Sequence, residues 1–268
     1  MTDKSDKDLL KQKTRSFKIK DKIEFHRHLT KLLELKKNQC VLDLGCGHGH
    51  TLMYIAEALA GTGKVIGVDI DEKALSIARE MLQNGIRSGH VELQVHDLSK
   101  KLPFPKMSFD RMVSHNVLEC IPDKIGFLND CYDALKKDGL LVMAHSDWDT
   151  QLYNSSFPIL TRKLVHNYAD TTQDWMEVSD GSIGRKLPEI FHKTKFSKYA
   201  SEVYVISNTR YVPLEYGYRI AQDIVNIAKK SGSFDEKELK QWINDLKRRD
   251  KGSAYFYSSI INIILAKK

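Results

Sequence analysis

Three glycines at alternate positions, Gly45, Gly47 and Gly49, directly follow the short apolar run 41–44. Glycines after a parallel strand let the backbone turn tightly, and they let a ligand approach the chain where no Cβ stands in the way. A helix that begins after such a loop also offers unpaired backbone N–H groups. The pattern indicates a ligand-binding loop, although a tight strand-to-helix turn with no ligand also uses glycines.

Asp69 ends the next apolar run, 64–69, and stands twenty residues after Gly49. An acidic residue at this place can accept hydrogen bonds from both hydroxyls of a ribose. A dinucleotide-binding fingerprint needs Gly or Ala where this chain has His50, and the chain contains no GxxxxGK[ST] phosphate-binding loop. The residues therefore favour a ligand that carries a ribose but no pyrophosphate or triphosphate.

Acidic and aromatic residues follow a later apolar run, 140–145, and include Asp147, Trp148 and Asp149. A carboxylate and a ring face together suit a cationic amine. The alternative is that both carboxylates cap the next helix and that Trp148 packs in the core. His145 and Asp147 are candidate general bases, which are needed only if the nucleophile arrives protonated.

Segments with strand and helix periodicity alternate along the chain at short pitch, which predicts a parallel sheet with right-handed crossovers. The expected strands cover 41–44, 64–69, 91–95, 111–115, 140–145, 201–207 and 255–266. The expected helices cover 23–35, 51–59, 72–84, 124–135, 159–168, 187–193, 213–230 and 235–249. Asp71 stands just before one of these helices and is expected to be its N-cap, not a ligand-binding residue.

The composition is that of an ordinary globular protein, with 41% hydrophobic and 29% charged residues among 268. No apolar run is long enough to span a membrane, and residues 1–22 have no apolar core of a secretory signal. The four cysteines form no CxxC pair and no zinc pattern. We therefore expect a cytoplasmic protein with free thiols and no metal.

The net charge of +7 is concentrated near the N-terminus, where residues 1–38 hold twelve Lys or Arg against six Asp or Glu. A solvated basic arm explains this better than a nucleic-acid-binding face, because the rest of the chain is nearly neutral. We expect a small-molecule partner and no nucleic acid, and the sequence defines no oligomeric state.

Four segments in order resemble the class I S-adenosylmethionine (SAM)-dependent methyltransferases, and within them the ubiquinone/menaquinone-biosynthesis type. These segments read VLDLGCGHG, VIGVDID, HDLSKKLPFPKMSFDRMVSHNVLECIPD and LKKDGLLVMAHSDWD, and the match covers about residues 38–149. The resemblance implies a Rossmann-like sheet of seven mostly parallel strands with helices on both faces. It also implies an antiparallel last strand and a helical insertion between the last two strands.

The same resemblance implies SAM as the methyl donor. Asp43, Gly45 and Gly47 would lie beneath its methionine, with Asp43 toward the ammonium, and His115 would lie near the same moiety. The remaining cofactor-binding residues would be Asp69 at the ribose, Asp97 and Leu98 at the adenine, and Ile70. Asp97 as a plain turn residue and His115 as a packed strand-end residue stay open alternatives.

Residues 1–20 are expected to be a flexible segment and 21–268 a single methyltransferase domain, in which insertions at about 149–184 and 209–250 cover the acceptor site. The residues expected to bind the acceptor are Trp148, Asp149, Tyr153, Tyr211 and Tyr216, although aromatic residues at such spacing also form cores. The expected reaction is methyl transfer to N or O of a small molecule. An RNA or other macromolecule methyltransferase using the basic arm, or a non-catalytic SAM-binding regulator, are the alternatives.

Overall fold

The computed structural model describes residues 15–173 and 176–268. Most of the segment expected to be flexible therefore lies outside the described residues. Among these residues, no helix is both long and apolar enough to cross a bilayer.

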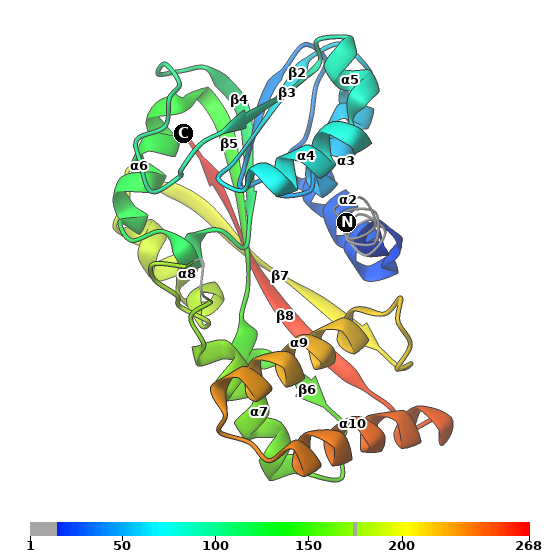
Figure 1. Ribbon diagram of the computed structural model, residues 1–268. Coiled ribbons are helices and arrows are strands. Elements are labelled where there is room, and N and C mark those ends of the chain that lie inside the picture. The colour runs from blue at the N-terminus through cyan, green and yellow to red at the C-terminus, as the bar shows by residue number, and fades with distance from the viewer. Residues whose placement is uncertain (1–14, 174–175) are drawn as a thin grey trace. The chain divides into compact units, whose positions relative to one another are not determined.

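Helices and strands alternate as the sequence predicts, and the described strands form one sheet in the order β3-β2-β1-β4-β5-β8-β6, with β7 paired to β8 (Figure 1). The Rossmann-like fold is confirmed, and a two-residue strand, β6, raises the number of described strands to eight. The elements are η1 (Arg15–Lys18), α2 (Lys20–Leu32), β1 (Cys40–Leu44), α3 (His50–Leu59), β2 (Lys64–Asp69), α4 (Glu72–Met81), α5 (Gln83–Arg87), β3 (Val91–Val95), β4 (Phe109–His115), η2 (Leu118–Cys120), α6 (Lys124–Ala134), β5 (Leu135–Ser146), η3 (Trp148–Thr150), β6 (Leu152–Tyr153), α7 (Pro158–Asp170), α8 (Ile183–His192), β7 (Lys198–Asn208), α9 (Tyr216–Ser231), α10 (Glu236–Lys251) and β8 (Tyr257–Lys267).

The described residues divide into two compact units. The sheet unit comprises residues 23–145, 185–202 and 262–268. The helical unit comprises the described residues of 15–22, 146–184 and 203–261. Strands β7 and β8 contribute residues to both units.

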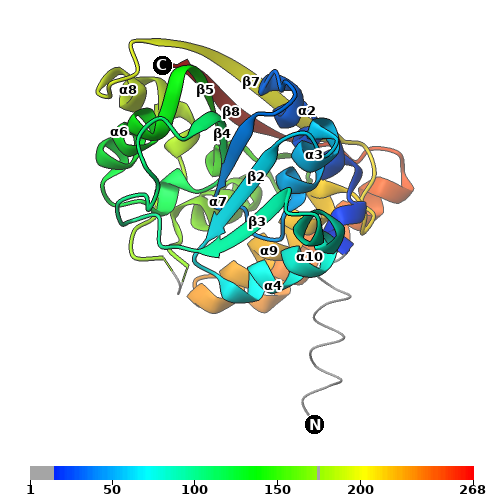
Figure 2. The same cartoon turned by 90° about the horizontal axis from the view of Figure 1, so that it is seen from above.

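Strands β1 to β5 of the sheet unit are parallel, and the central parts of β1, β2 and β5 are buried on both faces of the sheet, whereas most of the edge strand β3 is partly exposed. Figures 1 and 2 show α3 and α4 on one side of these strands and α6 and α8 on the other. Strands covered on both faces read as nearly continuous apolar runs, as 140–144 does in β5. The carboxyl ends of all five strands meet at one edge.

Several predicted boundaries differ from the structure, and the backbone or its hydrogen bonds explain three of these differences. Strand β5 begins at Leu135, because Leu135 pairs with Phe109 and an irregular register separates that pair from the next one at Arg111. The helix expected over 72–84 breaks at Leu82, whose φ of −109° and ψ of 15° are not helical. Helix α9 begins at Tyr216 because Asp21 accepts its N–H at 3.2 Å and Asn208 accepts the N–H of Gly217 at 2.8 Å.

The helical unit packs α7, α9 and α10 around an aromatic core. Trp242 of α10 and Tyr257 of β8 have no exposed surface, and Tyr153 packs on both rings at 5.3 and 4.9 Å. The indole N–H of Trp242 donates to the Thr161 hydroxyl on α7 at 3.0 Å. Buried rings with their polar atoms satisfied give this unit a core of its own.

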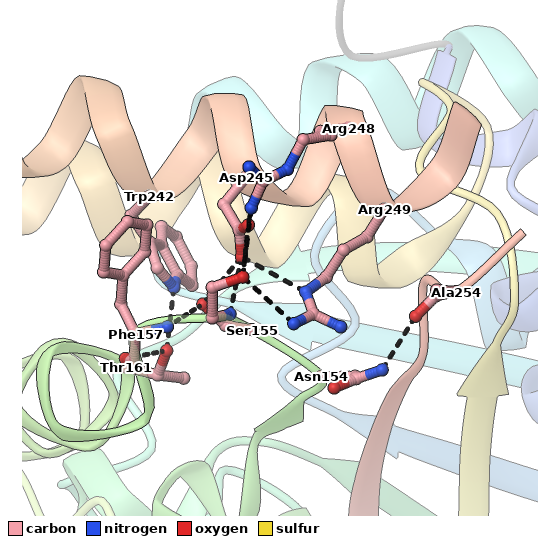
Figure 3. Close-up of polar contacts among 10 residues, drawn as sticks. Asn154, Ser155, Phe157, Thr161, Trp242, Asp245, Arg248, Arg249 and Ala254 are labelled. Atoms are coloured by element: carbon pink, nitrogen blue, oxygen red, sulfur yellow. Dashed lines mark hydrogen bonds and ion pairs between the residues drawn. The ribbon is translucent and has the colours of Figure 1, made fainter. Parts of the chain in front are cut away.

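Asp245 of α10 ties the loop before α7 to the helix (Figure 3). One carboxylate oxygen accepts the backbone N–H of Ser156 at 2.7 Å and the hydroxyl of Ser155 at 3.1 Å. The Ser156 hydroxyl and Arg248 donate to the other oxygen. Burial acts to raise the pKa of Asp245, but these hydrogen bonds outweigh it and hold the pKa at about 2.

We predict that Asp245→Ala destabilises the chain by about 2 to 3 kcal/mol, because it removes the acceptor of the hydrogen bonds from Ser155, Ser156 and Arg248. The folded-state pKa lies below the unfolded one, so the stabilisation is complete above pH ~4 and is lost as pH falls through about 2. Thermal unfolding of both proteins at several pH values measures this difference. The exposed neighbour Asn244→Ala is the control, and a deficit of Asp245→Ala that persists at pH 2 would contradict the assignment.

Candidate functional site

The predicted ligand-binding residues of the sheet unit line up along the carboxyl edge of its strands. Because the strand order is β3-β2-β1-β4-β5, Asp97, Asp69, the glycine loop with Asp43, His115 and His145 follow one another along this edge. Neighbouring strands lie roughly 4.8 Å apart, so the first four positions span about 14 Å. The edge can therefore hold an elongated ligand whose parts meet different strands.

The glycine loop has a backbone that only glycine adopts without strain. Gly45, Gly47 and Gly49 have φ values of 73°, 51° and 83°. A Cβ on Gly45 would stand 2.1 Å from Cγ2 of Val117, so this glycine is required by packing. A Cβ on Gly47 would meet no described heavy atom within 4 Å, so its missing side chain leaves room beside the loop.

Strand β2 holds this loop in place. Gly45 and Cys46 donate their N–H groups to the carbonyl of Val68 at 2.8 and 3.0 Å. One carboxylate oxygen of Asp69 accepts the N–H of Gly47 at 2.8 Å, and the other accepts the N–H of Asp71 at 2.9 Å. Since a carboxylate has about four acceptor sites, two remain for a ligand.

Asp43, inside strand β1, is a buried carboxyl group with 3% exposure. Burial and the neighbouring charge of Asp69 raise its pKa to about 8. Within the described part of the chain, its Oδ2 atom has no hydrogen-bonding partner. A buried polar atom is normally paired, so this oxygen marks a place where a ligand donor fits.

Asp97 lies just beyond β3 and is half-buried, with Leu98 buried beside it. Hydrogen bonds from the side chain and the backbone of Ser99 lower its pKa, so it is ionised at neutral pH. The carbonyl of Asp69 accepts the N–H of His96 at 2.9 Å, which brings this turn next to the end of β2. Ile70 is 62% exposed at the same edge, where an apolar side chain can cover a flat ring.

Asp71 is the N-cap of α4, as predicted, and its side chain accepts the N–H of Lys73 at 2.9 Å. Its role at the loop is therefore structural.

Two histidines stand at the ends of β4 and β5. His115 is half-buried, and its ring packs 4.7 Å from that of Phe25. His145 has no exposed surface, and its Nε2 atom lies 3.9 Å from Oε1 of Glu119, which is itself buried. Glu119 is a residue that the sequence reasoning did not place in the site, because nothing in its spacing points to a histidine on another strand.

The residues expected on the acceptor side, apart from His145, all lie in the helical unit. Asp147 is buried, and its carbonyl accepts the N–H and the hydroxyl of Thr150. It stands at the N-cap position of η3, but its side chain makes no capping hydrogen bond. Trp148 packs on Tyr168 at 5.7 Å, and Asp149 lies 3.2 Å from Nε2 of His166.

The three expected tyrosines fall into two neighbouring groups. Tyr153 and Tyr216 both pack on Tyr257, and the hydroxyl of Tyr153 donates to the carbonyl of Gly217. Tyr211 packs on Tyr218 and Tyr255, and its hydroxyl accepts from Gln222. Burial raises the pKa of Tyr216 to about 12, and its hydroxyl interacts with the side chain of Ser146, at the end of β5.

A second set that the sequence reasoning missed is a group of histidines beside the glycine loop. His26 of α2 stacks on His50 at 5.2 Å, and its Nδ1 atom lies 3.0 Å from the hydroxyl of Thr51. His26 is distant in sequence, so only the tertiary structure reveals the group. Among the described residues, no three His, Cys, Asp or Glu side chains are arranged to hold a metal.

Comparison with known proteins agrees with this geometry. A family model described as a methyltransferase domain matches residues 35–241. The demethylmenaquinone methyltransferase of Oceanobacillus iheyensis is 29% identical over 199 residues, which cover 68% of this chain and 82% of that relative. That of Listeria welshimeri is 28% identical over 194 residues, or 68% of this chain and 79% of the relative.

Solved structures show the same fold at low sequence identity. The YcgJ protein of Bacillus subtilis has a TM-score of 0.59 at 20% identity, covering 91% of this chain and 98% of its own. The geranyl diphosphate C-methyltransferase of Streptomyces coelicolor has a TM-score of 0.54 at 13% identity, covering 91% and 76%. The family match over residues 35–241, more than half of the chain, shows that the chain belongs to the methyltransferase domain family and is a class I SAM-dependent methyltransferase.

Proposed function

We propose that SAM binds along the carboxyl edge of the sheet unit and that its methyl group goes to an N or O atom of a small acceptor. The order of acidic groups along this edge carries the proposal. Asp97, Asp69 and Asp43 follow one another in the order in which SAM presents its adenine amine, its ribose hydroxyls and its ammonium. All three ligand groups are donors, and an ionised carboxylate is an acceptor only.

The residues present fit each part of SAM. The two acceptor sites left on Asp69 match the two ribose hydroxyls, and the exposed side chain of Ile70 with Leu98 beside Asp97 suits the adenine ring. The room beside Gly47 admits the methionine close to the backbone, and Oδ2 of Asp43 accepts a hydrogen bond from its ammonium. His115, at the end of β4, completes the proposed cofactor site on the methionine side.

Bound SAM supplies a methyl group on a positively charged sulfur, so transfer is an in-line displacement that leaves S-adenosylhomocysteine. Alignment of donor and acceptor can supply most of the rate. The protein's task is then to hold both molecules and to exclude water. His145 and Asp147 remain the proposed bases for an acceptor that arrives protonated.

We propose that Tyr216 binds the methyl acceptor. The other proposed acceptor-binding residues are Trp148, Asp149, Tyr153 and Tyr211. Tyr216 has the best support because its hydroxyl interacts with Ser146, at the carboxyl end of β5, where α/β enzymes bind their ligands. A hydroxyl pair of this kind can donate to or accept from an N or O nucleophile. We place the reaction in the cytoplasm because the four cysteines carry free thiols.

The pKa of Asp43 gives a test of the methionine position. With a pKa of about 8, Asp43 is mostly protonated at pH 7, and an ammonium ligand must ionise it. We predict that S-adenosylhomocysteine binding at pH 7 releases about one proton. Calorimetry in buffers with different ionisation enthalpies measures this number. Asp43→Asn should release close to none, and wild-type binding without proton release would contradict the position.

The acceptor atom is tested by product analysis. The chain is incubated with SAM and a panel of amines, phenols and carboxylic acids, and the methylated product is identified by mass spectrometry and NMR. We expect an N-methyl or O-methyl product, and Tyr216→Phe should lower kcat/KM for that acceptor by about tenfold, since one hydrogen bond is lost. Tyr218→Phe is the matched control. A C-methyl product would rule out the proposed acceptor atom.

A further inference from the structure

Four histidines gather beside the glycine loop of the sheet unit. This histidine cluster consists of His26, His48, His50 and His115, which come from α2, the loop, the start of α3 and the end of β4. The ring of His26 is stacked on that of His50 at 5.2 Å with an interplanar angle of 19° and meets that of His115 edge-on at 5.6 Å. The rings of His48 and His50 lie 6.1 Å apart.

The cluster is neither a metal site nor a buried core. No group of three metal-ligating side chains occurs in the residues that the structure describes. His48, His50 and His115 keep part of their surface exposed, while His26 is 7% exposed and fixed by Thr51. The arrangement thus has one anchored ring and several that a ligand can reach.

The position of the cluster is electrostatically unusual. Helix α3 begins at His50 after an N-cap glycine that makes no side-chain capping bond, and its first turn contains no acidic residue. The N-terminus of a helix carries partial positive charge, so imidazoles gathered there are unfavourable when protonated unless an anion joins them. Asp43 stands two residues before the glycine loop, and among the described residues its Oδ2 atom has no hydrogen-bonding partner, so a ligand donor such as an amine fits there.

An amino acid carries its ammonium and its carboxylate on the same carbon, so the two groups are about 2.5 Å apart. If Asp43 takes the ammonium of SAM, the carboxylate must lie beside the same loop. Asp43 and Asp69 would repel it, whereas the imidazole N–H groups of His48 and His50 can donate to it.

We propose that the histidine cluster, centred on His50, binds the methionine carboxylate of SAM. This assignment rests on the proposed SAM site. His48 and His50 are the proposed donors, and His26 is a positioning residue that holds the ring of His50 by stacking and is itself held by Thr51.

The test compares two ligands that differ only in the carboxylate. Calorimetry measures the Kd of S-adenosylhomocysteine and of its decarboxylated analogue, S-adenosyl-3-thiopropylamine, for the full chain and for His50→Asn. We expect His50→Asn to weaken S-adenosylhomocysteine binding by about tenfold or more, because a hydrogen bond to a charged group is lost. Binding of the analogue should change by less than about twofold.

Further variants separate recognition from structure. His26→Asn should also weaken the binding of S-adenosylhomocysteine more than the binding of the decarboxylated analogue. A merely structural role of His26 would weaken the binding of both ligands equally. His90→Asn is the control, because His90 bonds to the carbonyl of Gly63 at the opposite end of the strands. It should leave both Kd values unchanged.

Equal weakening of both ligands by His50→Asn would overturn the proposal, as would no change in either. A variant that binds S-adenosylhomocysteine normally but has a raised KM for a carboxylate-bearing acceptor would assign the cluster to the acceptor and overturn the SAM assignment. Failure of the wild-type chain to bind either ligand would instead contradict the proposed function.

Discussion

The site depends on one pair of hydrogen bonds, those that the carboxylate of Asp69 accepts from the backbone of Gly47 and Asp71. They join the end of β2 to the loop after β1 and keep a glycine backbone with positive φ in one shape. The same carboxylate keeps two further acceptor sites, to which we propose a ribose binds. Asp69 therefore links the shape of the loop to the proposed ligand binding. Burial, together with the nearby charge of Asp69, raises the pKa of Asp43 to about 8.

Much of the sheet unit could be predicted because the features of the local sequence there all indicate the same strands and helices. Apolar runs, turn glycines and a capping Asp71 define β1, β2 and α4, and parallel pairing then brings Asp43, Asp69 and Asp97 to one edge. The boundaries that differed depend on tertiary contacts. Helix α9 begins where Asp21, almost two hundred residues away, caps it, and no local pattern contains that information.

The acceptor side could be predicted far less well. The sequence places acidic and aromatic residues after β5 without showing their partners, and in the structure Trp148 and Asp149 contact α7, while Tyr153 contributes to the aromatic core of the helical unit. Aromatic side chains are equally suited to a core and to a pocket, so their spacing does not separate the two. Of the histidine cluster, only His115 was expected from the sequence, since His26 meets His50 only through folding.

The central claim, that Asp69 binds the ribose of SAM while it shapes the loop, is tested most directly by calorimetry of S-adenosylhomocysteine and of its 2′-deoxyribose analogue with the wild-type chain and Asp69→Asn. We expect Asp69→Asn to weaken S-adenosylhomocysteine binding by about 100-fold, since two charge-assisted hydrogen bonds are lost. It should weaken the deoxy analogue much less. Unchanged affinity in Asp69→Asn, or an equal loss for both ligands, would contradict the account.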